Sequence, residues 1–178
     1  MSAEFAVVSR RRVLKYGLGA AGFLFMGGAG SLLGLRGRAP DPGGLRCLTT
    51  HEYRTLARLA EAMFPRGGTF DFGAADVDLA RELDEFLVDS PHWDRRDLKR
   101  ALVLLEFGPV LFDHRLVTFS NLSEDGRRAH FESWAVGTSE LRRRAAVAFR
   151  TFLAMRFYDR PQMWPRLGYE GPLVHVAS

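Results

Sequence analysis

Apolar residues recur every three to four positions along most of the chain beyond residue 48, and this is the period of an α-helix. The first such segment begins at a capping box, in which Thr49 can accept a bond from an exposed backbone N–H while Glu52 reaches back. Its apolar face stops at Pro65, a residue that cannot continue a helix. The pattern therefore predicts a helix from Thr49 to about residue 64, with its buried face formed by Leu56, Leu59, Ala60 and Met63.

Two further helical segments are expected in the middle of the chain. Asp76 is the predicted start of one segment, which ends before Pro91. Asp94 is the predicted N-cap of a longer helix, which Gly108-Pro109 should break or kink. We expect a second piece of that helix over residues 110–118.

The C-terminal third of the chain predicts two more helices and a tail. Ser123 precedes a short helical segment, and residues 139–158 carry the strongest helical pattern of the chain. The tail from Asp159 is rich in Pro, Gly and aromatic residues, so we expect an extended aromatic arm. No window alternates with period two for long enough to predict a strand. The predicted fold class is therefore all-α, a small helical bundle.

The N-terminal part shows a different pattern, a basic cluster followed by twenty uncharged residues from Tyr16 to Leu35. The cluster is typical of a twin-arginine export signal, although Val13 stands where such signals more often carry phenylalanine. That pathway carries folded proteins across the bacterial inner membrane, so we expect a location in the periplasm or on the periplasmic face of that membrane. The residues that form the signal are Ser9, Arg10, Arg11, Leu14 and Lys15.

A second interpretation of the same segment stays open. Twenty helical residues at ~1.5 Å each span ~30 Å, enough to cross a bilayer core. No Ala-x-Ala cleavage site follows the apolar run, so an uncleaved membrane anchor is the alternative to a cleaved signal. We assign residues 1–35 to the signal or anchor helix, 36–47 to a Pro/Gly linker and 48–178 to the helical domain.

Charge and cysteine content narrow the range of functions. The formal net charge is +4, but the first 35 residues hold four basic residues and one acidic residue, which leaves about +1 for the rest. Nucleic-acid binding is therefore not expected, because it needs a basic folded domain. Cys47 is the only cysteine, which excludes an internal disulfide and a C-x-x-C-H haem attachment.

We find no constellation of residues that predicts a catalytic, cofactor-binding or metal site. The five histidines are scattered, and none pairs with another in an H-E-x-x-H arrangement. Asp113 and His114 are adjacent and should point to different faces, and Asp84 and Glu85 are interpreted as solvated helix charges. The G-x-G-x-x-G match at residues 17–22 follows arginines rather than a strand, so it does not predict a dinucleotide site.

The aromatic tail is the best candidate for a binding role. Trp, Tyr and Arg dominate the energies of protein interfaces, and prolines reduce the entropy lost when a segment docks. The arm can either fold back and cap its own bundle or dock on a partner through its outer side. The residues of the docking hypothesis are Tyr158, Trp164, Gly168 and Tyr169.

Both ends of the helical domain resemble the gluconate 2-dehydrogenase subunit 3 family. The similarity at the start is carried by Leu48-Thr49, Glu52, Leu56, Leu59-Ala60 and Met63-Phe64-Pro65. At the end it is carried by Phe157-Tyr158, Pro161, Trp164, Leu167-Gly168-Tyr169 and Gly171-Pro172. The segment between Pro65 and Asp76 is shorter than the family pattern, so the shape of a docking loop there does not carry over.

The resemblance implies a non-catalytic small subunit of an oxidoreductase complex. Its larger partner would be a flavoprotein of the glucose–methanol–choline class that holds FAD, in some complexes with a c-type cytochrome that carries haem c. The small subunit would escort the folded partner through the twin-arginine export machinery and stabilise it. Arg10 and Arg11 correspond to the signal pair, and Trp164, Gly168 and Tyr169 to the terminal signature. The alternative is a helical scaffold protein tethered to the membrane by an uncleaved N-terminal helix.

Overall fold

The computed structural model describes residues 34–67 and 70–170, and every element named below belongs to one compact unit that begins at Arg38. The described ranges contain α-helices and short 3-10 helices and no β-strand, so the all-α prediction is confirmed for them. The export-signal residues 9–15 lie outside these ranges. In chain order the elements are α3 (Thr50–Met63), α4 (Leu79–Asp89), α5 (His92–Phe112), η1 (Phe119–Asn121), α6 (Glu124–Val136), α7 (Glu140–Tyr158) and η2 (Trp164–Leu167).

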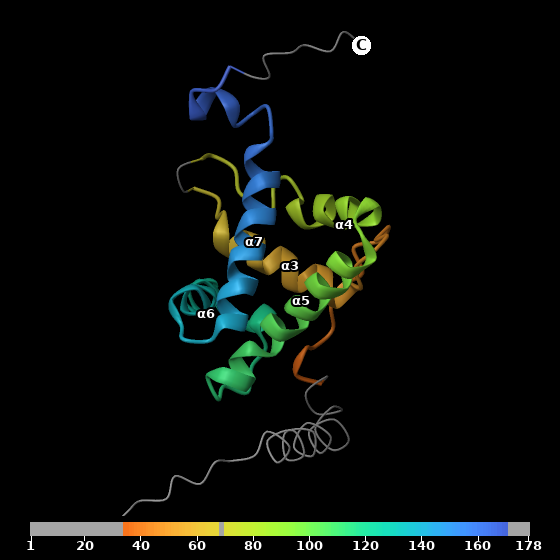
Figure 1. Ribbon diagram of the computed structural model, residues 1–178, viewed down its shortest axis with the longest axis vertical. Helices are drawn as coiled ribbons and strands as arrows, with labels where there is room; N and C mark the ends of the chain where they lie inside the picture. The colour runs from red at the N-terminus through yellow and green to blue at the C-terminus, as the bar shows by residue number, and fades with distance from the viewer. Residues whose placement is uncertain (1–33, 68–69, 171–178) are drawn as a thin grey trace, which may run out of the picture. The chain divides into compact units, whose positions relative to one another are not determined.

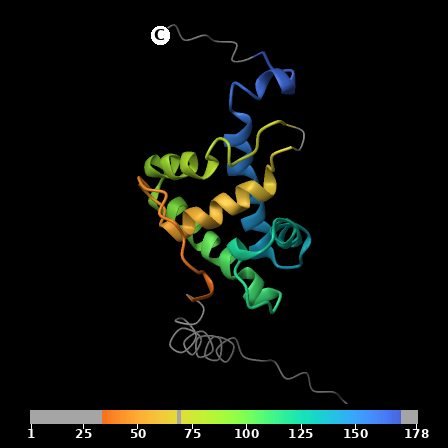
Figure 2. The ribbon, with the colours of Figure 1, turned by 180° about the vertical axis from the view of Figure 1, so that it is seen from behind.

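Helix α3 lies in the middle of the bundle, as both Figure 1 and Figure 2 show. It contacts α4, α5, α6 and η1, while α7 contacts α4 and α6. Leu56 and Leu59 of α3 are completely buried, as the periodicity of this segment predicts. The largest side chains of the surrounding core are Trp134, Phe119, Phe149 and Phe157.

Three of the predicted helix starts are confirmed. The Oγ1 atom of Thr49 accepts from the amide of Glu52 at 3.3 Å, and the Glu52 carboxylate accepts from the amide of Thr49 at 2.8 Å. Ser123 and Ser139 cap α6 and α7 through their hydroxyl groups in the same way. These caps satisfy backbone donors that the first turn of a helix leaves without a partner.

The predicted start of α4 at Asp76 is wrong by two residues. The helix begins after Asp78, whose carboxylate accepts from the amide of Arg81. Asp76 instead accepts from the amide of Gly73 at 2.8 Å and pairs with Arg66. Both aspartates are suitable caps, but the side chain of Asp76 already accepts a hydrogen bond within the loop that precedes α4.

Helix α5 also differs from its prediction. It begins at His92, directly after Pro91, so Asp94 lies in its first turn and is not its N-cap. The helix continues through Pro109, because Gly108 has no Cβ to meet the proline ring. It ends at Phe112, where the amides of Asp113 and Arg115 both bond to the carbonyl of Pro109, so residues 113–118 are a loop and not a second helical piece.

The start of the C-terminal arm is not extended. Residues 161–163 form a turn that leads into η2, and Gly168 closes η2 in the left-handed conformation with φ of 67°. Proline has a fixed φ near −65°, which suits turns and 3-10 helices as well as extended chain. The side chain of Met163 is fully buried in the core, so the arm begins by folding back on its own bundle.

Candidate partner-binding surface

The four residues of the docking hypothesis fall into two groups. Trp164 and Tyr169 lie together at η2, with ring centroids 5.5 Å apart in an edge-to-face arrangement. Gly168 connects them, since its left-handed backbone lets the amide of Tyr169 bond to the carbonyl of Trp164 at 2.9 Å. Tyr158 lies at the end of α7 and belongs to a second aromatic group, where its ring is 5.8 Å from that of Phe64. The structure therefore brings three of the four residues together.

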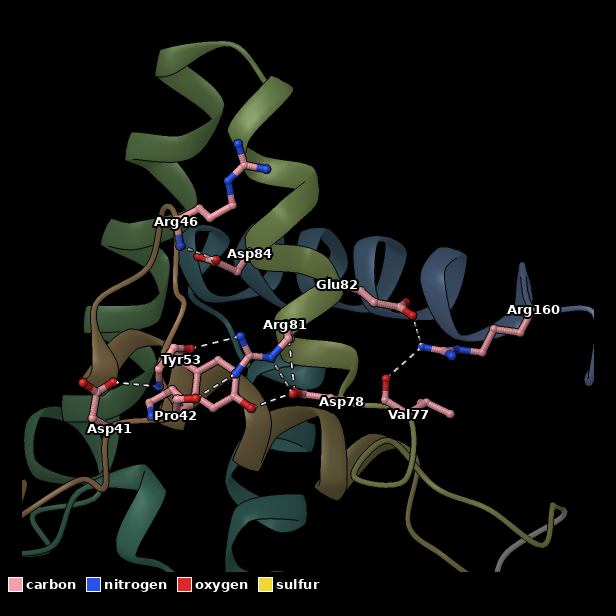
Figure 3. A network of polar contacts seen from close by, with 11 residues as sticks. Asp41, Pro42, Arg46, Tyr53, Val77, Asp78, Arg81, Glu82, Asp84 and Arg160 are labelled. Carbon is pink, nitrogen blue, oxygen red and sulfur yellow. Dashed lines mark hydrogen bonds and ion pairs between the residues drawn. The ribbon is translucent and has the colours of Figure 1, made fainter.

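The start of the arm is fixed to the bundle by both apolar and ionic contacts. Besides the buried Met163, the guanidinium of Arg160 bonds to the carbonyl of Val77 at 3.2 Å and pairs with Glu82 at 2.6 Å. Figure 3 shows Arg160 between these two partners. Arg166 of η2 pairs with Asp71 at 2.5 Å. These contacts hold η2 beside the loop that precedes α4.

The aromatic group around Tyr158 lines a cavity of about 620 Å³ between the loop after α3 and helices α6 and α7. The rings of Phe64 and Phe157 stack at 4.2 Å and form part of its wall. A cavity of this volume is large enough for a side chain or a small ligand. The six aromatic residues that line it are Phe64, Phe70, Phe72, Phe131, Phe157 and Tyr158.

The charged residues that line this cavity are two arginines and one glutamate. The guanidinium of Arg150 lies 5.5 Å from the centroid of Phe131, a cation–π arrangement. Arg128 pairs with Glu124 at 3.6 Å, one helical turn before it. Glu132 is the acidic member. The cavity is therefore lined by aromatic rings together with positively and negatively charged side chains, a composition common at protein interfaces.

Asp113 and the buried His130 form a titratable pair that sequence reasoning missed. The Nδ1 atom of His130 lies 2.7 Å from a carboxylate oxygen of Asp113, and its Nε2 atom accepts from the indole of Trp134 at 3.0 Å. Burial lowers the pKa of His130 below its ordinary value, although Asp113 opposes this. Both ring nitrogens have partners within the protein, so the imidazole is not free for proton transfer with a substrate. The i, i+4 spacing of His130 and Trp134 was the available signal in the sequence.

The interpretation of Asp84 as a solvated charge is wrong. Its side chain is 1% exposed and accepts three backbone amides, those of Arg46 at 2.7 Å, Cys47 at 2.9 Å and Leu48 at 2.5 Å. Arg46 and Cys47 are the last two residues of the linker and Leu48 follows them, so Asp84 fixes the end of the linker to α4. A carboxylate that accepts several backbone N–H groups is satisfied without a cation.

A second contact holds the linker slightly earlier. The guanidinium of Arg81 donates to the carbonyls of Pro42 and Gly43, both at 3.0 Å, and pairs with Asp78. Tyr53 of α3 donates its hydroxyl to Asp78 at 2.7 Å, and burial together with this bond raises the pKa of Tyr53 to about 12. Figure 3 shows this network, which joins the linker to α3 and α4.

Two features are absent from the part of the chain that the structure describes. Within residues 34–67 and 70–170, no three His, Cys, Asp or Glu side chains are grouped so that they could hold a metal ion. No helix in these same ranges combines the length and the apolar character needed to cross a membrane. Comparison with protein-family models, curated proteins and solved structures finds no match.

Proposed function

We propose that this chain is the non-catalytic small subunit of an exported flavoprotein oxidoreductase complex. Residues 1–35 direct the complex to the twin-arginine export machinery, and the helical domain binds and stabilises a larger flavoprotein of the glucose–methanol–choline class. That partner holds FAD, and in complexes with a c-type cytochrome the haem c receives the electrons. The complex works in the periplasm or at the periplasmic face of the inner membrane.

The observation that supports docking is the contrast within the C-terminal arm. Met163 and Arg160 hold its start on the bundle, whereas Leu167 and Tyr169 a few residues later are about half exposed. Large apolar and aromatic side chains on a fixed surface are typical of an interface. The preceding anchor reduces the entropy that this surface would lose on binding. The inner side of the arm therefore covers its own bundle, and its outer side is available for docking.

The first experiment is a pull-down of the tagged chain from native periplasm and membranes, with intact mass and a visible spectrum. We expect the tagged chain to copurify with a larger chain in stoichiometric amount that carries the absorbance of a flavin. A lone, colourless chain would contradict the accessory role. It would favour the membrane-tethered scaffold, which carbonate-resistant retention of the full-length chain would then support.

The docking residues are tested with a matched pair of double variants. Trp164→Ala with Tyr169→Ala removes the aromatic pair of the arm, and we expect the flavoprotein to be lost from the pull-down. Leu116→Ala with Val136→Ala removes two apolar side chains that are 83% and 86% exposed elsewhere, and should leave the complex intact. Equal recovery with both variants would show that the arm is not the docking face.

The export role needs a separate test, because docking and escort are different functions. Deletion of residues 1–35 should leave the flavoprotein partner in the cytoplasm, measured as the distribution of its activity between cytoplasm and periplasm. Replacement of Arg10 and Arg11 by Lys tests the twin-arginine pathway itself with the charge retained. Unchanged periplasmic activity in both cases would contradict the escort role.

A further inference from the structure

A second surface, distinct from the aromatic cavity, brings together five of the 21 Lys and Arg residues of the chain beyond Leu35. An open hollow of about 660 Å³ lies between the end of the linker and the first half of α5. We name it the basic groove. Its lining contains five cationic side chains and one carboxylate, that of Glu52. The cationic residues are Arg46, Arg95, Arg96, Lys99 and Arg100.

Two features of the fold bring these charges together. The spacing of residues 95, 96, 99 and 100 places all four on neighbouring positions of one side of α5. Arg46 comes from a distant part of the sequence and is fixed there by the bond from its amide to Asp84. In Figure 3 the side chain of Arg46 extends away from Asp84. The groove therefore depends on the same buried carboxylate that holds the linker.

The charge of the groove is only partly neutralised within the protein. Lys99 pairs with Glu52 at 3.5 Å, and Arg100 pairs with Asp97 at 3.3 Å. The guanidinium groups of Arg46, Arg95 and Arg96 make no ion pair with any residue of the described part of the chain. Three arginines without an acidic partner on one open surface produce a strong local positive potential.

The distribution of charge shows how concentrated this surface is. Residues 36–178 carry a net charge of +1 in total, and the residues that line the groove carry +4 with His92 neutral. The remainder of this part of the chain is therefore net negative. The groove is thus a local positive patch on a domain that is otherwise net negative, and such a patch attracts anionic ligands.

We propose that the basic groove binds the phosphodiester headgroups of anionic phospholipids and holds the domain against a membrane surface. Arginine matches phosphate oxygens with two parallel N–H bonds, which makes adjacent arginines suited to phosphate. Val103 also lines the groove and is 42% exposed. An apolar side chain therefore lies beside the cations and could contact the acyl chains of a bound lipid. An open hollow with several cations suits an array of headgroups better than one enclosed anion.

The position of the groove in the chain favours a membrane over an acidic protein as its occupant. Eleven residues separate Leu35, the end of the apolar segment, from Arg46, and a chain of that length reaches at most about 40 Å. If the apolar segment is kept as an anchor, this length of chain holds the groove near a membrane surface. This inference rests on the export part of the proposed function and does not need the flavoprotein partner.

The test is binding of the purified full-length chain to vesicles of phosphatidylcholine with and without phosphatidylglycerol. The ratio of the two partition coefficients measures the effect of lipid charge. Arg10, Arg11, Arg12 and Lys15 also contribute to this ratio, so the groove is assessed by the change in the ratio between the wild type and the groove variants. We expect tighter binding to vesicles with phosphatidylglycerol, and weaker binding as salt is raised. Arg95→Gln with Arg96→Gln should reduce the ratio by about five-fold per charge.

A control with the same change in net charge separates the groove from general electrostatics. Arg143→Gln with Arg144→Gln removes two adjacent arginines of α7 that pair with Glu140, and should leave the ratio nearly unchanged. Arg96→Gln with Arg100→Gln serves as a second groove variant, and circular dichroism confirms that each variant is folded. Equal losses in groove and control variants would overturn the proposal.

Other occupants give distinct results in the same experiment. A ratio of one for the wild-type chain would overturn the proposal. So would calorimetric binding of inorganic phosphate without any preference for phosphatidylglycerol, which would assign the groove to a free anion. An acidic protein partner would be assigned if groove variants lost a copurifying chain but kept the wild-type vesicle ratio. Vesicle binding without a flavoprotein in the pull-down would leave this inference standing and contradict the accessory role alone.

Discussion

The indole of Trp134 donates a hydrogen bond from Nε1 to Nε2 of His130 over 3.0 Å, one turn of α6 apart. The other ring nitrogen, Nδ1, lies 2.7 Å from the carboxylate of Asp113. Because Nε2 accepts, the imidazole is neutral with its proton on Nδ1. The side chain of His130 is 2% exposed, so this neutral form is held in a dry environment. Burial accordingly lowers the pKa of His130, with the opposing effect of Asp113 smaller than that of burial.

We expect the stability of the domain to fall as the pH drops below about 6.5, the ordinary pKa of histidine. The folded-state pKa of His130 is lower than that value, so the unfolded chain takes up a proton before the folded chain does. The free energy of unfolding therefore decreases with falling pH in this range. Urea unfolding at several pH values from about 7.5 to 5.5 measures the effect.

The variant His130→Gln provides the comparison for this prediction. Its side chain cannot titrate, so the dependence of its unfolding free energy on pH in this range should be weaker than that of the wild type. Protonation of His130 also removes the acceptor of the Trp134 indole, so a change in tryptophan fluorescence should accompany the titration. A pH dependence identical in both proteins would contradict the assignment.

Gly108→Ala should destabilise the bundle because α5 passes very close to this histidine. A Cβ atom at Gly108 would lie 2.6 Å from Nε2 of His130 and 3.0 Å from Cζ2 of Trp134. Both rings are fixed by their hydrogen bonds, so they cannot move aside without losing them. We expect a loss of about 1–3 kcal/mol of unfolding free energy, the usual cost of overpacking a core. Thermal unfolding measures it, with Gly34→Ala as a control because no atom lies within 4 Å there.

The sequence predicted local structure better than the contacts between distant segments. The capping residues Thr49, Ser123 and Ser139 were found because a cap and its partner are three residues apart. The helix through Pro109 was not found, because Gly108 and Pro109 were both interpreted as helix breakers, whereas the glycine leaves room for the proline ring. Asp76 and Asp78 are both suitable N-caps for α4. The hydrogen bonds of the preceding loop, and not the propensity of either residue, determine where the helix begins.

In the candidate site, too, the sequence predicted the local features but not the contacts between distant residues. The aromatic content of the arm indicated a binding surface, and Trp164 and Tyr169 do lie together because Gly168 permits a local turn. The cavity beside Tyr158 depends on residues from three parts of the chain, and the basic groove on Arg46 with α5. Only the tertiary fold brings these residues together. Asp84 was misread for this reason, since its three partners lie about 37 residues earlier.

Asp84→Asn should loosen the linker and destabilise the domain. An amide side chain has one acceptor oxygen in place of two, so at least one of the backbone amides from Arg46 to Leu48 loses its partner. Bonds to a charged acceptor contribute about 1.5–3 kcal/mol, and we expect a loss in that range. Chemical denaturation measures it. Glu85→Gln is the control, an exposed neighbour that changes by the same charge, and an equal loss there would contradict the role given to Asp84.

Tyr53 should titrate at unusually high pH in the folded domain. Its pKa is raised to about 12 by burial and by the bond to Asp78, whereas an unfolded tyrosine titrates near 10. The unfolded chain therefore loses this proton first, and the contribution of Tyr53 to stability is lost as the pH rises from about 10 to 12. Ultraviolet absorbance of tyrosinate checks this. The late-titrating component should be missing in Tyr53→Phe and its persistence there would disprove the assignment.

Gly168→Ala should disturb the arm without affecting the core. The backbone of Gly168 has φ of 67°, a conformation that costs an L-residue roughly 1 kcal/mol, and no atom lies within 4 Å of the added Cβ. The strain acts on the turn that sets Tyr169 against Trp164. Gly43→Ala imposes the same strain at φ of 66° in the linker and is the matched control. If the arm docks on a partner, Gly168→Ala weakens copurification of that partner more than Gly43→Ala does, while both variants keep nearly the same melting temperature. Equal recovery of the partner would mean that the geometry of this turn does not contribute to binding.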